Sequence, residues 1–147
     1  MAKTGDRQDP FVAFRFEVRL DDISSGGFSE CSGLQLETEV EDYAEGGLNT
    51  HLRRFPGRTK QSNLTLKRGI VDRELHDWYV RLAQEGSVEF KSGSILVHDP
   101  SGGPVTMEWQ FYRAFPCKWN GPDLNATQSS VAVETLELCH HGLIRRP

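Results

Sequence analysis

Apolar and polar residues alternate along most of this chain, which is the pattern of β-strands with one buried face. In residues 11–20 the alternation is regular, with Phe14 and Phe16 on one face and charged residues on the other. The alternation breaks at Ser92-Gly93, where we expect a β-bulge or an interruption. Further strands are predicted at residues 28–31, 34–43, 62–69, 88–99, 105–115 and 129–144.

The period changes in residues 72–86, which we predict to form a helix. Asp72 is placed to cap its start and Gly86 to end it. The apolar residues recur with helical spacing and form the predicted helix core: Leu75, Trp78, Tyr79 and Leu82. Because strands dominate and the helix lies in the middle of the order, the predicted fold class is mainly β, a small β-barrel or sandwich of about six or seven strands with one α-helix.

The third predicted strand carries acids at alternate positions, Glu37, Glu39 and Glu41. Strand geometry places these carboxylates on one face. A catalytic pair needs two different environments, so that one carboxyl is protonated while the other is ionised, and equivalent exposed carboxylates lack this. We therefore expect a solvated surface or a face that lines an aqueous space, with Lys67 or Arg68 between the acids as cross-strand partners.

The chain is predicted to be one domain with two irregular segments. Residues 1–10 are polar, end in proline, and are expected to be a flexible N-terminal arm, while residues 11–147 form the domain. Residues 44–61 show no period and contain three glycines and one proline. We predict an extended loop or a flexible hairpin there, and loops of this length in a compact domain are usually functional or disordered.

Composition and charge narrow the range of functions. Of 147 residues, 37% are hydrophobic, and the net charge of −4 argues against a nucleic-acid reader, which usually carries a strong basic patch. No stretch approaches the roughly 20 apolar residues of a membrane span, so no stable membrane insertion is expected. The N-terminal residues also lack the apolar run of a signal peptide.

The residue types that carry chemistry form no recognised site. The cysteines Cys31, Cys117 and Cys139 fit neither a disulfide framework nor a zinc pattern, and we expect thiols, with a disulfide between subunits left open. His140 and His141 are neighbours in a strand and point to opposite faces, which disfavours a shared metal. The nucleophile-elbow, phosphate-loop and zinc-protease motifs are absent. We therefore expect no enzyme activity, metal or cofactor.

Long strands covered by a single helix leave strand edges exposed, and closure into a barrel removes such edges. Closure across several subunits would have the same effect. A head-to-tail contact between identical subunits generates a ring when the rotation closes. The pattern is therefore compatible with a barrel built from more than one subunit.

Four phrases of the sequence resemble, in this order, the tail tube proteins of contractile phages and extracellular contractile injection systems: GGFSECSGL, ETEVEDYAEGG, RRFPGRTKQSNLTLKRGI and VETLELCHHGL. The resemblance covers roughly residues 11–144, and His-His-Gly stands where the family pattern has His-Glu-Gly. It implies a β-barrel subunit with one outer helix, related in fold to the tube protein of type VI secretion. It also implies hexameric rings that stack into a hollow inner tube within a contractile sheath.

The resemblance also implies roles for particular residues. Glu37, Glu39 and Glu41 are candidates to face the lumen, where an acidic wall would repel DNA. The candidates for contacts between stacked rings are Tyr43, Gly46, Gly47, Arg53, Arg54, Phe55, Pro56 and Arg58. The acids expected to receive the arginines on the next ring are Asp21 with Asp22, or Glu41 with Asp42.

The implied partners are further copies of the chain, a contractile sheath protein, baseplate or hub and tail terminator proteins, and a tape measure protein. DNA or a protein payload would pass through the lumen. Assembly is expected in the bacterial or host cytoplasm, and the mature location would be a virion tail or an injection particle. The alternatives are a baseplate hub or tail terminator subunit of the same fold, or a small-molecule-binding β-barrel.

Overall fold

The computed structural model describes residues 15–23, 27–44, 46–47, 52–99 and 103–146. The predicted N-terminal arm, residues 1–10, lies outside the described residues. The elements, in chain order, are β1 (Phe16–Leu20), β2 (Glu30–Ser32), β3 (Leu36–Tyr43), β4 (Arg53–Gln61), β5 (Leu64–Gly69), α1 (Glu74–Glu85), β6 (Lys91–His98), β7 (Val105–Asn120), β8 (Val133–Cys139) and β9 (Gly142–Arg146). This is the mainly β fold predicted from the sequence.

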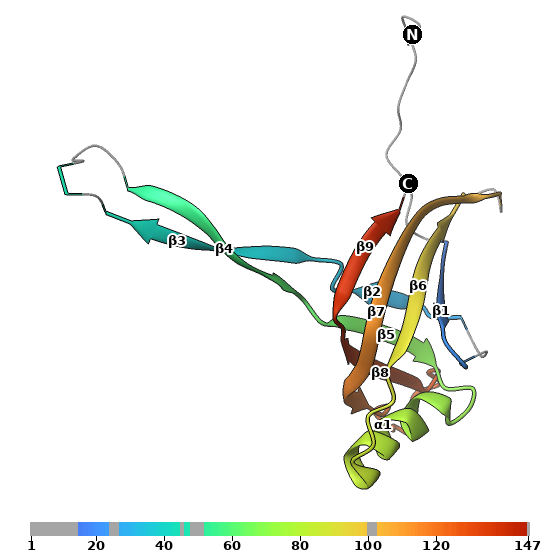
Figure 1. Cartoon of the computed structure of the whole chain (residues 1–147). Coiled ribbons are helices and arrows are strands. Elements are labelled where there is room, and N and C mark those ends of the chain that lie inside the picture. The colour runs from blue at the N-terminus through green and yellow to red at the C-terminus, as the bar shows by residue number, and fades with distance from the viewer. Residues whose placement is uncertain (1–14, 24–26, 45, 48–51, 100–102, 147) are drawn as a thin grey trace, which may run out of the picture.

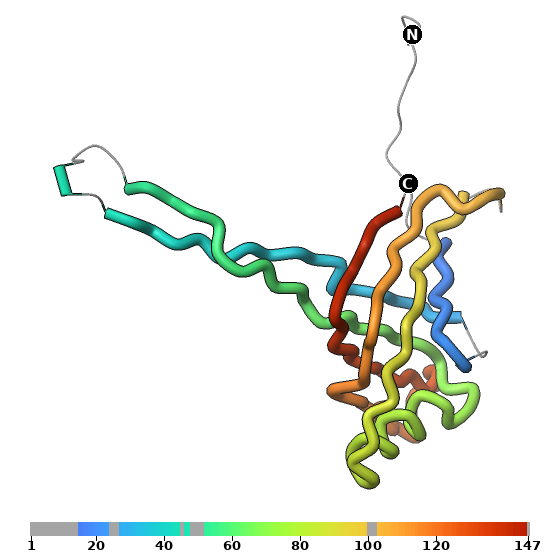
Figure 2. The backbone as a smooth tube through the Cα atoms, viewed as in Figure 1, coloured from blue at the N-terminus to red at the C-terminus, as the bar shows by residue number. Residues whose placement is uncertain are grey.

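Most strands belong to one seven-stranded sheet with the order β1-β6-β7-β8-β5-β2, and β9 also pairs with β7. All of these pairs are antiparallel. β7 is 16 residues long, and its first half pairs with β6 and β9 while its second half pairs with β8. β1, β6, β7 and β9 run across the direction of β2, β5 and β8, so the sheet folds over on itself (Figures 1 and 2). α1 lies at one end of the two layers.

β7 carries a β-bulge at its middle. Lys91 pairs with Ala114 whereas Gly93 pairs with Phe111, so β7 has one more residue than β6 in this interval. Arg113 takes up the bulge with a φ of 50°. A Cβ at Gly93 would overlap the ring of Phe111, so glycine is required where the strands approach. This is the interruption predicted at this point of the sequence.

Two predicted strand boundaries were wrong. β7 continues past residue 115 to Asn120, and a register shift next to Pro116 accommodates the proline in the strand. The last predicted strand, residues 129–144, is divided into β8 and β9 by His140 and His141. Val131 is exposed and precedes β8. Its apolar side chain was counted as part of the strand, so the predicted strand begins too early.

The core lies between the two layers and against α1. Leu75 and Trp78 of the helix are buried, whereas Tyr79 and Leu82 of the predicted helix core are half-buried. The helix starts beside Asp72, whose Oδ1 accepts a hydrogen bond of 3.0 Å from the Glu74 amide. It ends at Gly86, which has a φ of 65°. The core residues from the strands are Val18, Leu20, Leu64, Leu66, Ile95, Phe111, Ala114, Leu136 and Leu138, joined by Phe28.

A buried ion pair joins β5, β8 and the start of the helix. Arg68 and Glu134 are almost completely buried, and Arg68 Nε lies 2.6 Å from Glu134 Oε1. Arg68 also contacts Asp72 at 3.0 Å, and Trp119 Nε1 donates to Glu134 Oε2 at 3.1 Å. Because each charge has charged or hydrogen-bonding partners, the network avoids the large cost of an uncompensated buried charge. It therefore ties the neighbouring strands β5 and β8, the second half of β7 and the start of the helix together within one layer.

Glu134→Ala should lower the free energy of unfolding strongly, because it removes the buried carboxylate that lies 2.6 Å from the buried Arg68. We expect a loss near the lower end of about 3–5 kcal/mol, measured by urea unfolding of the unassembled subunit. The matched control is Glu30→Gln, because Glu30 faces Lys67 at 3.5 Å on the surface of the same sheet. The control should lower the free energy of unfolding by less than about 1 kcal/mol. Equal losses in the two variants would show that the buried ion pair stabilises the subunit no more than the surface pair does.

Candidate assembly surface

β3 and β4 form a two-stranded sheet of their own, which we call the hairpin. The hairpin projects away from the rest of the described chain, the body (Figures 1 and 2). All of β3 is exposed, and all of β4 except Gly57. Of the two predictions for residues 44–61, an extended loop or a flexible hairpin, residues 53–61 follow the second, because they form β4 and pair with β3. Neither face of β4 is buried, so its sequence has no hydrophobic period.

The hairpin is anchored where its strands enter the body. Gly33 has a φ of 96°, and a Cβ there would overlap the carbonyl oxygen of Asn63. Asn63 Nδ2 donates to Glu137 Oε1 at 2.8 Å, and the Ser62 carbonyl oxygen lies 3.0 Å from His140 Nε2. The close approach and the hydrogen bonds fix the direction in which the hairpin leaves the body.

The three predicted carboxylates lie along β3 and face a lysine of β4. Lys60 is directly opposite Glu37 and forms an ion pair with Glu39. The pKa of Lys60 is raised, chiefly by its hydrogen bond with Glu39 and further by the charges of Glu39 and Glu37. Glu41 lies opposite Phe55. Sequence reasoning missed Lys60, because its position opposite the acids follows from the register of the hairpin, which the sequence pattern did not specify.

The cross-strand partners predicted for these acids were wrong. Lys67 lies in the body with its Nζ 3.5 Å from Glu30, and Arg68 is in the buried network. Both belong to β5, which begins at Leu64, after the hairpin has joined the body. On the hairpin itself Arg54 pairs with Asp42 at 3.1 Å.

The hairpin exposes apolar side chains together with its charges. Leu36, Val40, Tyr43 and Phe55 are between 47% and 60% exposed. A two-stranded ribbon is marginally stable in water, and contiguous exposed apolar side chains mark interaction surfaces. The hairpin therefore has the composition of a segment that another protein surface covers.

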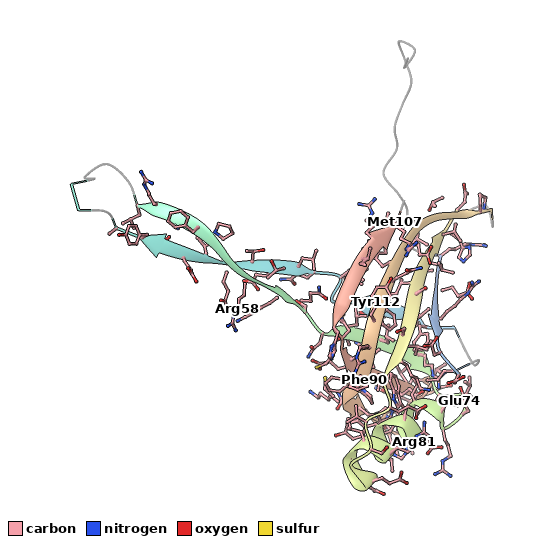
Figure 3. The ribbon with its side chains drawn as sticks, in the orientation of Figure 1. Arg58, Glu74, Arg81, Phe90, Met107 and Tyr112 are labelled. Carbon is pink, nitrogen blue, oxygen red and sulfur yellow. The ribbon has the colours of Figure 1, made fainter. Side chains whose placement is uncertain are left out.

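The remaining predicted contact residues also lie on the hairpin. Gly46 and Gly47 form a turn at its outer end, and Arg53 begins β4. Figure 3 shows the Arg58 side chain pointing away from the ribbon of the hairpin, far from Glu74 and Arg81 on the helix. One extended element thus carries the arginines and apolar residues predicted to contact a neighbouring ring, whereas Asp21 and Asp22, two of the acids predicted to receive the arginines, lie in the body.

The body offers further unpaired backbone. In the described part of the chain, β1 and β2 stand at the two ends of the strand order, and β9 has a single neighbour, β7. Strand edges of this kind present rows of N–H and C=O groups that can pair with another chain. The hairpin and these edges together form the candidate assembly surface.

The described residues do not assemble a reactive centre. Across the described ranges, no group of three or more His, Cys, Asp and Glu side chains could hold a metal ion. A hollow of about 250 Å³ beside α1 is lined by charges that pair with one another, with Glu89 3.1 Å from Arg81 and 3.0 Å from Lys91. The hydrogen bond from Lys91 is the main cause that lowers the pKa of Glu89. Of the helices described, none is long and apolar enough to cross a membrane.

Comparison with known proteins identifies the fold and the family. The sequence matches the family model of the T4-like virus tail tube protein gp19 over residues 12–144. No curated protein matches it. A chain in the cryo-EM structure of the anti-feeding prophage tube-terminating cap is 27% identical, covers 99% of both chains and superposes with a TM-score of 0.84.

Two further structures extend the comparison. A chain in the sheath–tube complex of the extracellular contractile injection system PVC is 28% identical, with 93% of this chain and 91% of that chain covered and a TM-score of 0.82. Hcp1 from Flavobacterium johnsoniae shares the fold at 13% identity, with a TM-score of 0.54 over 88% of this chain and 93% of that chain.

These matches confirm the resemblance found in the sequence and the role of a structural tube subunit. They also account for a molecule whose distinctive feature is an uncovered hairpin. The family match spans nearly the whole chain, and the protein belongs to the family of the T4-like virus tail tube protein gp19.

Proposed function

We propose that this protein forms hexameric rings that stack head to tail into the hollow inner tube of a contractile tail or injection particle. The observation that carries the proposal is the hairpin, whose exposed apolar side chains are placed to be covered by neighbouring copies. The tube is a passive conduit for DNA or a protein payload, without enzyme activity of its own. A sheath protein surrounds it, and baseplate, terminator and tape measure proteins set its ends and length.

The energetics of the hairpin favour self-assembly. Fully burying one large apolar side chain is worth about 1.5–3 kcal/mol. Leu36, Val40, Tyr43 and Phe55 each expose about half of their surface, so a neighbouring subunit has substantial apolar area left to cover. In a stacked tube this gain is repeated at every subunit.

The acids of the hairpin suit a surface that faces the lumen. Glu37, Glu39 and Glu41 share one strand face, and Lys60 neutralises part of their charge. Repeated around a ring, this face would present a negative band to the lumen that repels a DNA polyanion.

The arginines of β4 are the candidates for contacts with the next ring. Arg54 already pairs with Asp42 within the subunit. Arg53, Arg54 and Arg58 are the candidates to reach acids on the next ring, with Asp21 and Asp22, or Glu41 and Asp42, as possible receivers. The subunit would be made and assembled in the cytoplasm and would act in the released particle.

A tail terminator subunit of the same fold is the second candidate, because one of the similar chains comes from a tube-terminating cap. Electron microscopy of the purified protein distinguishes the two. A tube protein should give rings with a central hole and long hollow stacks, whereas a terminator should give single rings that do not stack. A compact monomer at high concentration would contradict both.

Removing the outer half of the hairpin should prevent stacking and leave the body folded. Deleting residues 40–56 joins Glu39 to Gly57 and leaves the Thr38–Thr59 pair to close a shorter hairpin. Because the hairpin is outside the core, circular dichroism and the urea midpoint should stay close to those of the intact protein. Tubes should be lost in negative-stain images.

The matched control places the change on another exposed apolar residue. Leu124 is 88% exposed in the segment between β7 and β8, so Leu124→Ser should leave tube formation intact. Tubes of normal length from the deletion variant would refute a role for the hairpin in stacking.

Reversing the hairpin acids tests whether they line the lumen. In tubes of the variant Glu37→Lys, Glu39→Lys and Glu41→Lys, short DNA should be retained at low salt and released at high salt, because phosphate contacts are salt-dependent. DNA held inside the tube should resist DNase I. The corresponding glutamine variant, which removes charge without reversing it, should retain less. Retained DNA that the nuclease digests would place the acids on the outer wall.

A further inference from the structure

Cys117 and Cys139 lie on neighbouring strands and on the side of the sheet opposite the core. Burial alternates along β8, with Leu136 and Leu138 in the core, so Cys139 points to the other face. Cys117 is the extra residue at a register shift of β7 against β8, and it is exposed. The bulge brings an additional side chain to the strand that carries Cys139.

One amide side chain binds both sulfur atoms. Asn63 Nδ2 lies 3.7 Å from Cys117 Sγ, and the Cys139 thiol donates to Asn63 Oδ1 at 3.3 Å. The Cys117 thiol in turn donates to the Glu137 carbonyl oxygen at 3.3 Å, and Asn63 Nδ2 also donates to the Glu137 carboxylate. These bonds hold the two thiols in one polar cluster at the root of the hairpin.

The position of the two thiols against Asn63 brings the sulfur atoms to one side chain. Desolvation and, after it, the interaction with the Cys139 thiol raise the pKa of Cys117 to about 12. At neutral pH Cys117 is therefore a protonated thiol, and the pair is stable as a dithiol under reducing conditions.

We propose that Cys117 and Cys139 form a dithiol modification site that closes into a disulfide when the subunit meets a low-molecular-weight disulfide. The Cys139 thiolate attacks one sulfur of the oxidant, which forms a mixed disulfide and expels one small thiolate. The Cys117 thiolate then attacks Cys139 Sγ and expels the second small thiolate. The two cysteine protons pass to these leaving groups, so a disulfide and two thiols become a protein disulfide and two small thiols.

The bond would change the hairpin root as well as the sheet. It ties β7 to β8 across the exposed segment 121–132, which closes a loop and restricts the unfolded chain. It also consumes both S–H donors, so Asn63 Oδ1 and the Glu137 carbonyl oxygen lose the hydrogen bonds that they receive. The chemical change therefore lies next to the residues that anchor the hairpin.

Cys31 provides an internal control. It lies on β2, packs against the core and is half-buried, and burial raises its pKa to about 11. Its position on the inner face keeps it away from the cluster around Asn63. Exposure alone would favour oxidation of Cys117, whereas Cys31 and Cys139 are both half-buried, so a link from Cys117 to Cys139 and not to Cys31 reports the geometry of the pair.

The test treats the purified, fully reduced subunit with oxidised glutathione, followed by intact mass measurement and peptide mapping without reductant. We expect a loss of about 2 Da per chain, a linked peptide containing Cys117 and Cys139, and an upward shift in Tm. Cys31→Ser should retain the mass loss and the linked peptide. Cys117→Ser should instead accumulate a glutathione adduct on Cys139.

The peptide map of the wild-type protein shows whether Cys117 and Cys139 are linked, even if a variant fails to fold. Persistent free thiols, glutathione adducts without an internal link, or a linked peptide that contains Cys31 would overturn the proposal. Dithiothreitol should reverse both the mass loss and the shift in Tm, and a mass loss that it does not reverse would also count against a disulfide.

Discussion

The constraint on which this structure depends is that a two-stranded hairpin has no core of its own. Each strand of the hairpin has one hydrogen-bonded neighbour, and every residue except Gly57 is exposed. Cross-strand pairs such as Thr38 with Thr59, whose hydroxyl oxygens are 3.0 Å apart, contribute only a fraction of a kcal/mol to about one. A chain that keeps such an element must therefore gain stability from what covers it. The protein is therefore best understood as one subunit of a larger assembly, in which neighbouring surfaces cover the hairpin.

The body supplies what the hairpin lacks. Its core is closed on two sides by the folded sheet and at one end by α1, and the buried Arg68–Glu134 pair joins β5 to β8 within one layer. The strands of the hairpin continue from β2 and into β5, so the rigid layer sets their direction through Gly33 and Asn63. A projecting element can make reproducible contacts with a neighbour only if its root is fixed in this way.

The sequence predicted the elements whose residues follow a period, including the fully exposed β3, and failed for β4, which follows none. The helix was found because Leu75 and Trp78 recur with a helical period, and β5 because Leu64 and Leu66 alternate with polar residues. β4 could not be found in this way, since its side chains face water on both sides and follow no hydrophobic period. The site was accordingly recovered in part: the acids of β3 were identified from strand parity, but their partner Lys60 was not.

Buried charge was the other feature that the sequence interpretation missed. Strand parity places Arg68 on the face of Leu64 and Leu66, but its charge led to an expected surface position, and the fold shows it buried beside Glu134. The charges of the hairpin follow a simpler rule, with acids concentrated on β3 and arginine and lysine on β4. Two hairpins that met β3 to β3 would bring like charges together, whereas β3 beside β4 of another copy joins opposite charges. Repulsion in the wrong arrangement then selects a single direction of contact, and identical subunits that all meet in one direction form closed rings or continuous stacks.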